Sequence, residues 1–143
     1  MSDGRPTLYS AALLAQARAP QHAGTLDDPS YVWRVDNPLC GDRVTLHLKV
    51  VDQHIVDVAH RTRGCALCMA SASVMTAMVL ERSIHEARSR ARGVVDALRP
   101  PAGAPLRLED PALELFAGLE AAPGRTECVA LPWVALLDGE RGQ

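Results

Sequence analysis

Four cysteines are the residues of this chain whose type and position could support chemistry: Cys40, Cys65, Cys68 and Cys128. The N-terminus shows no basic start followed by an apolar stretch and a cleavage site, so we expect a cytoplasmic protein. A reducing compartment disfavours structural disulfides and favours thiol chemistry or metal binding. A free cysteine is also often just a small buried hydrophobic residue, so its neighbours have to be considered.

A short loop brings a thiol and a carboxylate close together in the sequence. Residues 37–42 read Asn-Pro-Leu-Cys-Gly-Asp and stand directly before a predicted strand. Cys40 and Asp42 can converge on one ion in a tight loop, for which Gly41 permits the necessary backbone angles. The pattern therefore indicates a metal or thiol site where the strand begins.

Two further cysteines stand at predicted helix starts. Cys65 follows a glycine, and Cys128 comes shortly after the Pro-Gly pair at 123–124. The positive end of a helix stabilises a thiolate there and lowers the thiol pKa. Together with Cys40 and Asp42 they would form a set of three sulfurs and one oxygen, which suits zinc. No compact ligand motif joins the four, so the pattern alone leaves a metal or sulfur site and buried structural cysteines as open alternatives.

The composition excludes several classes of function. The chain has 143 residues, of which 48% are hydrophobic, enough for one core in one domain. A net charge of −2 argues against a basic nucleic-acid binder, and 3% aromatic residues leave no platform for stacking bases. No apolar run approaches the roughly 20 residues that span a bilayer. We therefore expect neither nucleic acid nor a membrane as partner.

A strict alternation of apolar and polar side chains marks the centre of the predicted sheet. Residues 43–51 show this alternation, which has the period of a strand with one buried face. Residues 30–35 and 54–62 are expected to form its neighbours. Three consecutive strands with short connections favour an antiparallel sheet with one covered face. His47 and His60 are expected on the open face.

Helical patterns occupy most of the remaining chain. Helices are expected at residues 8–19, 65–80, 83–98, 110–119 and 127–137. Strands followed by helices indicate an α+β fold, with a three-stranded antiparallel sheet and helices packed on one face. We therefore expect a single domain in four parts: an N-terminal helix and connector (1–29), the sheet (30–64), the helices (65–137) and a frayed tail (138–143).

Three motifs occur in an order that resembles a known family. The first is the Asn-Pro-Leu-Cys-Gly-Asp loop at 37–42, followed by the alternating strand. The second is formed by residues 64–67 and 70–76, and the third runs from 125–128 into Leu-Pro-Trp at 131–133. Together they resemble the U-type iron–sulfur cluster assembly proteins, the SufU, IscU and NifU N-terminal-like family. The match covers nearly the whole chain.

The third motif separates the branches of that family. Glu127 stands where the IscU branch has a histidine before the last cysteine. Leu-Pro-Trp at 131–133 is similar to the SufU branch, and residues 100–123 supply the extra segment that this branch carries. The chain therefore resembles the SufU branch.

That resemblance implies a site, a cofactor and a partner. It implies zinc held by Cys40, Asp42, Cys65 and Cys128, with Cys40 as the sulfur acceptor. The implied partner is a SufS-type cysteine desulfurase, and the sulfur would go on to the downstream iron–sulfur assembly machinery. The chain would act with this desulfurase and not as a stand-alone enzyme. A zinc-bound thiolate stays deprotonated but is held back by the metal, so replacement of Cys40 on zinc by a partner side chain would free it to attack the persulfide.

Two other functions remain open with the same ligands. The chain could be a scaffold on which a [2Fe–2S] cluster is built, because thiolates suit both metals. It could also be a zinc-folded binding module that stimulates the desulfurase.

Three further residues are candidates for supporting roles. Cys68 departs from the family, which commonly has serine there. It is either a small buried side chain or an auxiliary thiol beside Cys65. Arg61 and Arg63 precede Cys65 and are expected to help keep the thiolates ionised.

Overall fold

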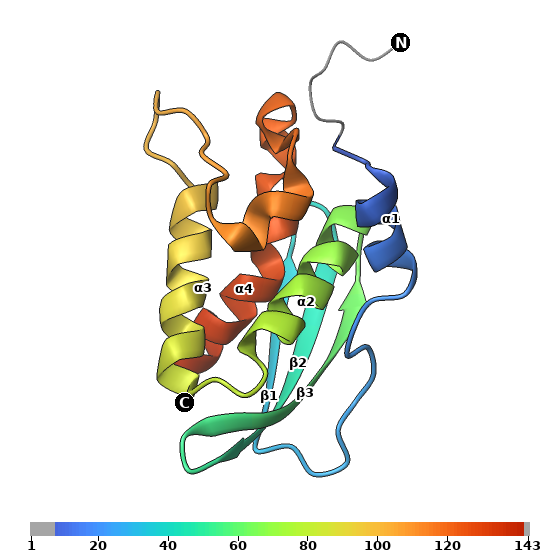
Figure 1. Cartoon of the computed structure of the whole chain (residues 1–143), viewed down its shortest axis with the longest axis vertical. Coiled ribbons are helices and arrows are strands. Elements are labelled where there is room, and N and C mark those ends of the chain that lie inside the picture. The colour runs from blue at the N-terminus through green and yellow to red at the C-terminus, as the bar shows by residue number, and fades with distance from the viewer. Residues whose placement is uncertain (1–7, 142–143) are drawn as a thin grey trace.

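The sheet is built by the alternating segment and its two neighbours. The computed structural model describes residues 8–141. Its strands are β1 (Tyr31–Asn37), β2 (Asp42–Val51) and β3 (His54–Arg63). They form an antiparallel sheet in the order β1-β2-β3. Val44, Leu46 and Leu48 of β2 are fully buried under the helices, so the predicted α+β class with helices on one face is confirmed (Figure 1).

Helices cover one face of this sheet. The α-helices are α1 (Ala11–Arg18), α2 (Ala66–Val79), α3 (Ile84–Leu98) and α4 (Thr126–Arg141). Three short 3₁₀ segments precede α4: η1 (Pro111–Phe116), η2 (Leu119–Ala121) and η3 (Pro123–Arg125). Helices α2 and α4 pack on the strands, α1 packs on α2, and α3 packs on α4 (Figure 1). Among residues 8–141, none of the helices has the length and apolar composition needed to cross a membrane.

Helix starts follow the expected capping chemistry. The Ser10 side chain accepts a hydrogen bond from the Leu13 amide at 3.1 Å, which caps α1. Ser83 and Glu86 form a reciprocal capping box at the start of α3, as predicted. Asp110 caps η1 through the Ala112 amide, so this segment is helical as expected but adopts the tighter 3₁₀ form.

The C-terminal boundary was predicted too early. The tail was expected from residue 138, yet α4 continues to Arg141, and only residues 142–143 of that tail lie outside the described range. Once a helix is nucleated and packed, adding residues is inexpensive, and a glycine at 139 is not enough to end it.

A buried polar contact joins the two helices that carry cysteines. Trp133 of α4 is fully buried, and its indole N–H donates to the Ser71 hydroxyl of α2 at 3.2 Å. The same hydroxyl donates to the Val129 carbonyl. Because buried polar groups are costly when unpaired, these bonds fix how α2 and α4 lie against each other. These contacts thereby fix the relative positions of the N-terminal ends of α2 and α4, which carry Cys65 and Cys128.

His60 lies on the covered face, so its predicted position on the open face was wrong. The strand register places His60 opposite Leu46, whose side chain faces the helices. Its Nε2 donates to the Gln21 carbonyl at 3.0 Å, and Nδ1 is 2.7 Å from the Thr62 hydroxyl. The connector before β1 closes over this edge, because the Gly24 amide donates to the His60 carbonyl at 2.9 Å.

The buried His60 should make stability depend on pH. Burial lowers the pKa of His60 below its ordinary value of 6.5. Below pH 6.5 the unfolded chain therefore binds a proton that the folded protein resists, so the free energy of unfolding should fall as the pH falls through this range. We expect the urea midpoint of EDTA-treated protein to drop between pH 7.5 and 5.5.

A matched pair of variants checks this assignment. His60→Gln should flatten the pH dependence of the urea midpoint, whereas His85→Gln, at an exposed histidine, should leave it unchanged. Equal slopes in wild type and His60→Gln would remove His60 as the cause.

Candidate metal centre

Three chain segments that are distant in sequence meet at one end of the sheet. They are the turn between β1 and β2, the passage from β3 into α2, and the start of α4, all at the upper end in Figure 1. In the first turn Gly41 has a φ of 76°, and its amide donates to the Asn37 carbonyl at 2.8 Å. This left-handed conformation suits glycine and closes the turn that separates Cys40 from Asp42.

Three of the four predicted metal ligands form a close group here, and the fourth contacts one of them. Ligand atoms of Cys40, Asp42 and Cys128 all lie within 4.8 Å of one another. Cys65 does not belong to this mutually close group, but its Sγ is 3.9 Å from Asp42 Oδ2. Tetrahedral zinc with bonds of about 2.3 Å to sulfur needs its ligand atoms roughly 3.8 Å apart, so a small contraction would bring Cys40, Asp42 and Cys128 to that spacing.

Burial increases from the mouth of the cluster inward. Cys40 is exposed and Cys65 is half-buried, whereas Asp42 and Cys128 keep only 5% and 4% of their surface. Cys40 is therefore the thiol that a partner molecule can reach.

Gly64 makes room for the Asp42 carboxylate. A Cβ at this position would lie 2.7 Å from Asp42 Cγ and 2.8 Å from Oδ1, closer than nonbonded atoms approach. Gly64 is therefore required on steric grounds, because a side chain at this position would collide with the Asp42 carboxylate.

The surroundings of Cys128 favour its neutral thiol until a cation arrives. Burial, followed by the negative potential of Cys65, raises the pKa of the Cys128 thiol to about 12. Burial also raises the pKa of the Cys68 thiol. A buried carboxylate among thiols is what a divalent cation neutralises, so the donor set fits zinc in both charge and softness.

Arg61 and Arg63 lie on the opposite face of the sheet from this cluster. They pair with Thr45 and Arg43 of β2, whose side chains alternate away from the buried face to which Asp42 belongs. Their expected support of the thiolates therefore has to act through the sheet, and it stays a prediction.

A different arginine, Arg125, comes three residues before Cys128 in the chain. Arg125, which precedes α4, donates to the Tyr9 hydroxyl at 3.0 Å. This hydrogen bond, followed by the negative potential of Cys65 and Cys128, raises the pKa of Arg125. Sequence reasoning included Arg125 in the third motif but assigned it no role; its position three residues before Cys128 was the available signal.

Cys68 is fully buried in the core, one helical turn after Cys65. Within residues 8–141 the group of mutually close metal-binding side chains does not include it. Its role as an auxiliary thiol stays a prediction.

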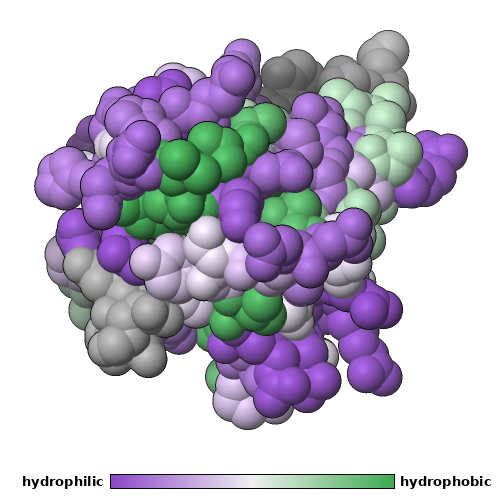
Figure 2. Space-filling view, turned by 90° about the horizontal axis from the view of Figure 1, so that it is seen from below, coloured by the Kyte–Doolittle hydropathy of each residue, from purple (hydrophilic) through white to green (hydrophobic). Residues whose placement is uncertain are grey.

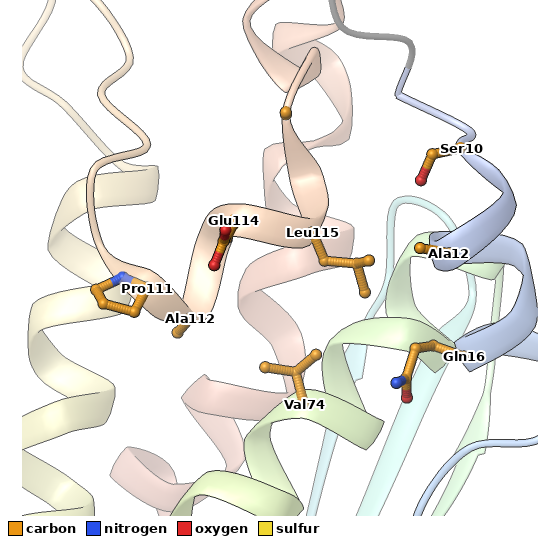
Figure 3. A pocket seen from close by; sticks show the side chains of 9 residues that line it. Ser10, Ala12, Gln16, Val74, Pro111, Ala112, Glu114 and Leu115 are labelled. Carbon is orange, nitrogen blue, oxygen red and sulfur yellow. The ribbon is translucent and has the colours of Figure 1, made fainter.

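Two other surfaces carry few side chains that could bind a metal or act as a nucleophile. A groove between α1, α2 and η1 is lined mainly by small and apolar side chains, among them Ala12, Val74 and Leu115, with Glu114 as its one acidic residue (Figure 3). The end of the molecule opposite the cysteines shows apolar residues in separate patches interrupted by hydrophilic ones (Figure 2). The cysteine–aspartate cluster is therefore the candidate site.

An antiparallel sheet with helices on one face and a cysteine–aspartate cluster at one end defines a small α+β domain organised around that cluster. The model of the NifU-like N terminal domain matches residues 8–107, most of the chain. The chain therefore belongs to the NifU-like N-terminal domain family, and Cys128 lies beyond the matched range.

Curated relatives carry two kinds of name. A protein of Streptococcus pyogenes serotype M1 named "Iron-sulfur cluster assembly scaffold protein IscU" is 34% identical over 129 residues, covering 90% of this chain and 80% of the relative. A protein of Bacillus subtilis (strain 168) named "Zinc-dependent sulfurtransferase SufU" is 32% identical over 134 residues, covering 93% and 89%. Both alignments are long enough to include the α4 region.

Solved structures share the fold. The crystal structure of a putative iron–sulfur cluster assembly scaffold protein for the SUF system from Fervidobacterium islandicum AW-1 has a TM-score of 0.79 at 25% identity, covering 92% of this chain and 96% of that chain. A NifU-like N-terminal structure from Brucella abortus has a TM-score of 0.78 at 29% identity, covering 94% and 92%.

Proposed function

We propose that this chain is a zinc-dependent sulfur-transfer protein of the SufU type that accepts persulfide sulfur from a SufS-type cysteine desulfurase for iron–sulfur cluster assembly. The observation that carries the proposal is one exposed thiol, Cys40, beside the buried side chains of Asp42 and Cys128. We place this activity in the cytoplasm, where thiols stay reduced. The Bacillus subtilis relative with its zinc-dependent sulfurtransferase name supports this branch of the family.

In this proposal Cys40, Asp42, Cys65 and Cys128 hold the zinc. When bound, zinc keeps the thiolates deprotonated at neutral pH. Asp42 and Cys128 are buried, so they hold the cluster in place, while Cys40 can leave it without opening the core. The freed Cys40 thiolate is then the nucleophile.

The transfer itself is a thiol–disulfide type of exchange. The Cys40 thiolate attacks the outer, sulfane sulfur of the persulfide on the desulfurase cysteine. A bond forms between Cys40 Sγ and the sulfane sulfur, and the bond between that sulfur and the desulfurase Sγ breaks. The desulfurase cysteine leaves as a thiolate, and Cys40 becomes a persulfide. No external oxidant or reductant is required.

A scaffold for a [2Fe–2S] cluster is the second candidate function, because the Streptococcus pyogenes relative bears a scaffold name. Position 127 favours the first candidate. The IscU branch has a histidine before the last cysteine, whereas here Glu127 is bound by Arg99 through two hydrogen bonds of 2.7 and 2.9 Å. Its carboxylate is engaged on the surface and is not an additional ligand.

Metal analysis of anaerobically purified protein distinguishes the two candidates. We expect one equivalent of tightly bound zinc and transfer of sulfane sulfur from a SufS-type desulfurase to the chain. Visible iron–sulfide absorption together with a failure to accept sulfane sulfur would overturn the proposal in favour of the scaffold.

A further inference from the structure

A cationic pocket lies on the open face of the sheet, opposite the face that carries the cysteine cluster. It has a volume of about 590 Å³ and is lined by Arg43, Arg61 and Arg63, by His47, and by three threonines. No acidic residue lines it. We propose that this pocket, which we call the arginine pocket, binds a small phosphate-bearing ligand. The proposal does not rest on the proposed function, because the pocket and Asp42 lie on opposite faces.

The arrangement of the three arginines is unfavourable without an anion. Arg43 and Arg63 are direct cross-strand partners on the same face, and Arg61 lies two residues before Arg63 on that face. Like charges directly opposite each other destabilise a sheet. Arg43 is paired with Asp36, so Arg61 and Arg63 carry the uncompensated charge, which a bound anion would neutralise.

The neighbouring acidic residue Asp36 compensates only one of the three arginines, Arg43. Asp36 accepts a hydrogen bond from Arg43 and is also 3.8 Å from Arg34. Within the described part of the chain, Arg61 and Arg63 form no ion pair, although the whole chain has a net charge of −2. The pocket thus keeps a local excess of positive charge in an overall acidic protein.

The other lining residues add hydrogen-bond donors. The Leu26 amide donates to His47 Nδ1 at 3.4 Å, so a neutral His47 ring carries its proton on Nε2 and can donate from there. Thr25 and Thr45 contribute hydroxyl groups, whereas the Thr62 hydroxyl is bonded to His60 on the covered face. Guanidinium groups with additional N–H and O–H donors match the geometry and charge of phosphate oxygens.

The size and the wall of the pocket favour a small ligand over an acidic protein segment. Small-molecule pockets have volumes of about 300–1,000 Å³. The connector that supplies Thr25 is fixed against the sheet by the Gly24 hydrogen bond to β3 and by the ion pair of Asp28 with Lys49 at 3.0 Å. It forms a fixed side wall, which a flat docking surface would not have.

Calorimetric titration of the zinc-loaded protein with inorganic pyrophosphate tests the proposal. We expect saturable binding that is weakened about tenfold or more by Arg61→Gln and by Arg63→Gln, because each removes a charge-assisted hydrogen bond. Arg107→Gln is the matched control, since Arg107 is exposed and lies elsewhere. Because pyrophosphate also binds zinc, the contribution of the arginine pocket is the difference in pyrophosphate affinity between wild type and the Arg61→Gln or Arg63→Gln variant.

Three outcomes would overturn the proposal. The first is equal binding by wild type, Arg61→Gln and Arg107→Gln. The second is binding of a glutamate-rich peptide in place of pyrophosphate, which would assign the pocket to an acidic protein partner. The third is a lower melting temperature of ligand-free Arg63→Gln than of wild type. Because the substitution removes charge repulsion, we expect this variant to melt at or above the wild-type temperature.

Discussion

Replacing Cys40 by serine is expected to abolish sulfur acceptance while leaving the fold intact. Cys40 is exposed in the turn before β2, so the substitution removes no packing. A serine hydroxyl is hardly ionised at neutral pH and cannot form a persulfide, so the loss should be complete and not partial. The measurement is transfer of labelled sulfane sulfur from a SufS-type desulfurase, with circular dichroism to confirm the fold.

Cys68→Ala provides the matched thiol control. This side chain is fully buried in the core, and its removal creates only a small cavity. The variant should still accept sulfur. Retained acceptance by Cys40→Ser would remove Cys40 from the acceptor role, and loss of acceptance in a folded Cys68→Ala variant would give Cys68 a part in the reaction.

The sheet could be predicted because its signals are local. Strict alternation in β2 defines one buried face, and short connections force antiparallel neighbours. The capping box at Ser83 defines the start of α3 for the same reason, since both partners lie within four residues. The register of β3 against β2 was harder to predict from the sequence. The position of His60 depends on how β3 pairs with β2, where the pairing shifts between Lys49 and Val50.

The site required contacts that no local pattern encodes. Cys40 and Asp42 share one turn, but Cys65 and Cys128 reach it only because α2 and α4 pack side by side on the sheet. A resemblance of motifs could name these residues without showing that they meet. The position of the Arg125 side chain likewise depends on Tyr9, which is distant in the sequence. Long-range packing determines such positions, so sequence periodicity could not supply them.

Replacing Gly64 by alanine is expected to weaken zinc binding although no ligand residue is replaced. The new methyl group would lie 2.7 Å from Asp42 Cγ, so the carboxylate or the backbone has to move. Overpacking of this kind costs about 1–3 kcal/mol of stability. Disturbance of ligand placement typically lowers metal affinity by about 10- to 100-fold. The measurement is competition for zinc with a calibrated chelator.

Two comparisons make the Gly64 argument specific to Asp42. Gly93→Ala in α3 has no atom within 4 Å of the added Cβ, so it should leave zinc affinity unchanged and raise stability by up to about 1 kcal/mol. In an Asp42→Ala background the main clashing atoms are gone, so Gly64→Ala should cost little further affinity, which gives a non-additive double-mutant cycle. Additive losses in that cycle would mean that Gly64 acts through the backbone before Cys65 and not through the carboxylate. Non-additive losses would assign to Gly64 the steric role of making room for Asp42 at the metal centre.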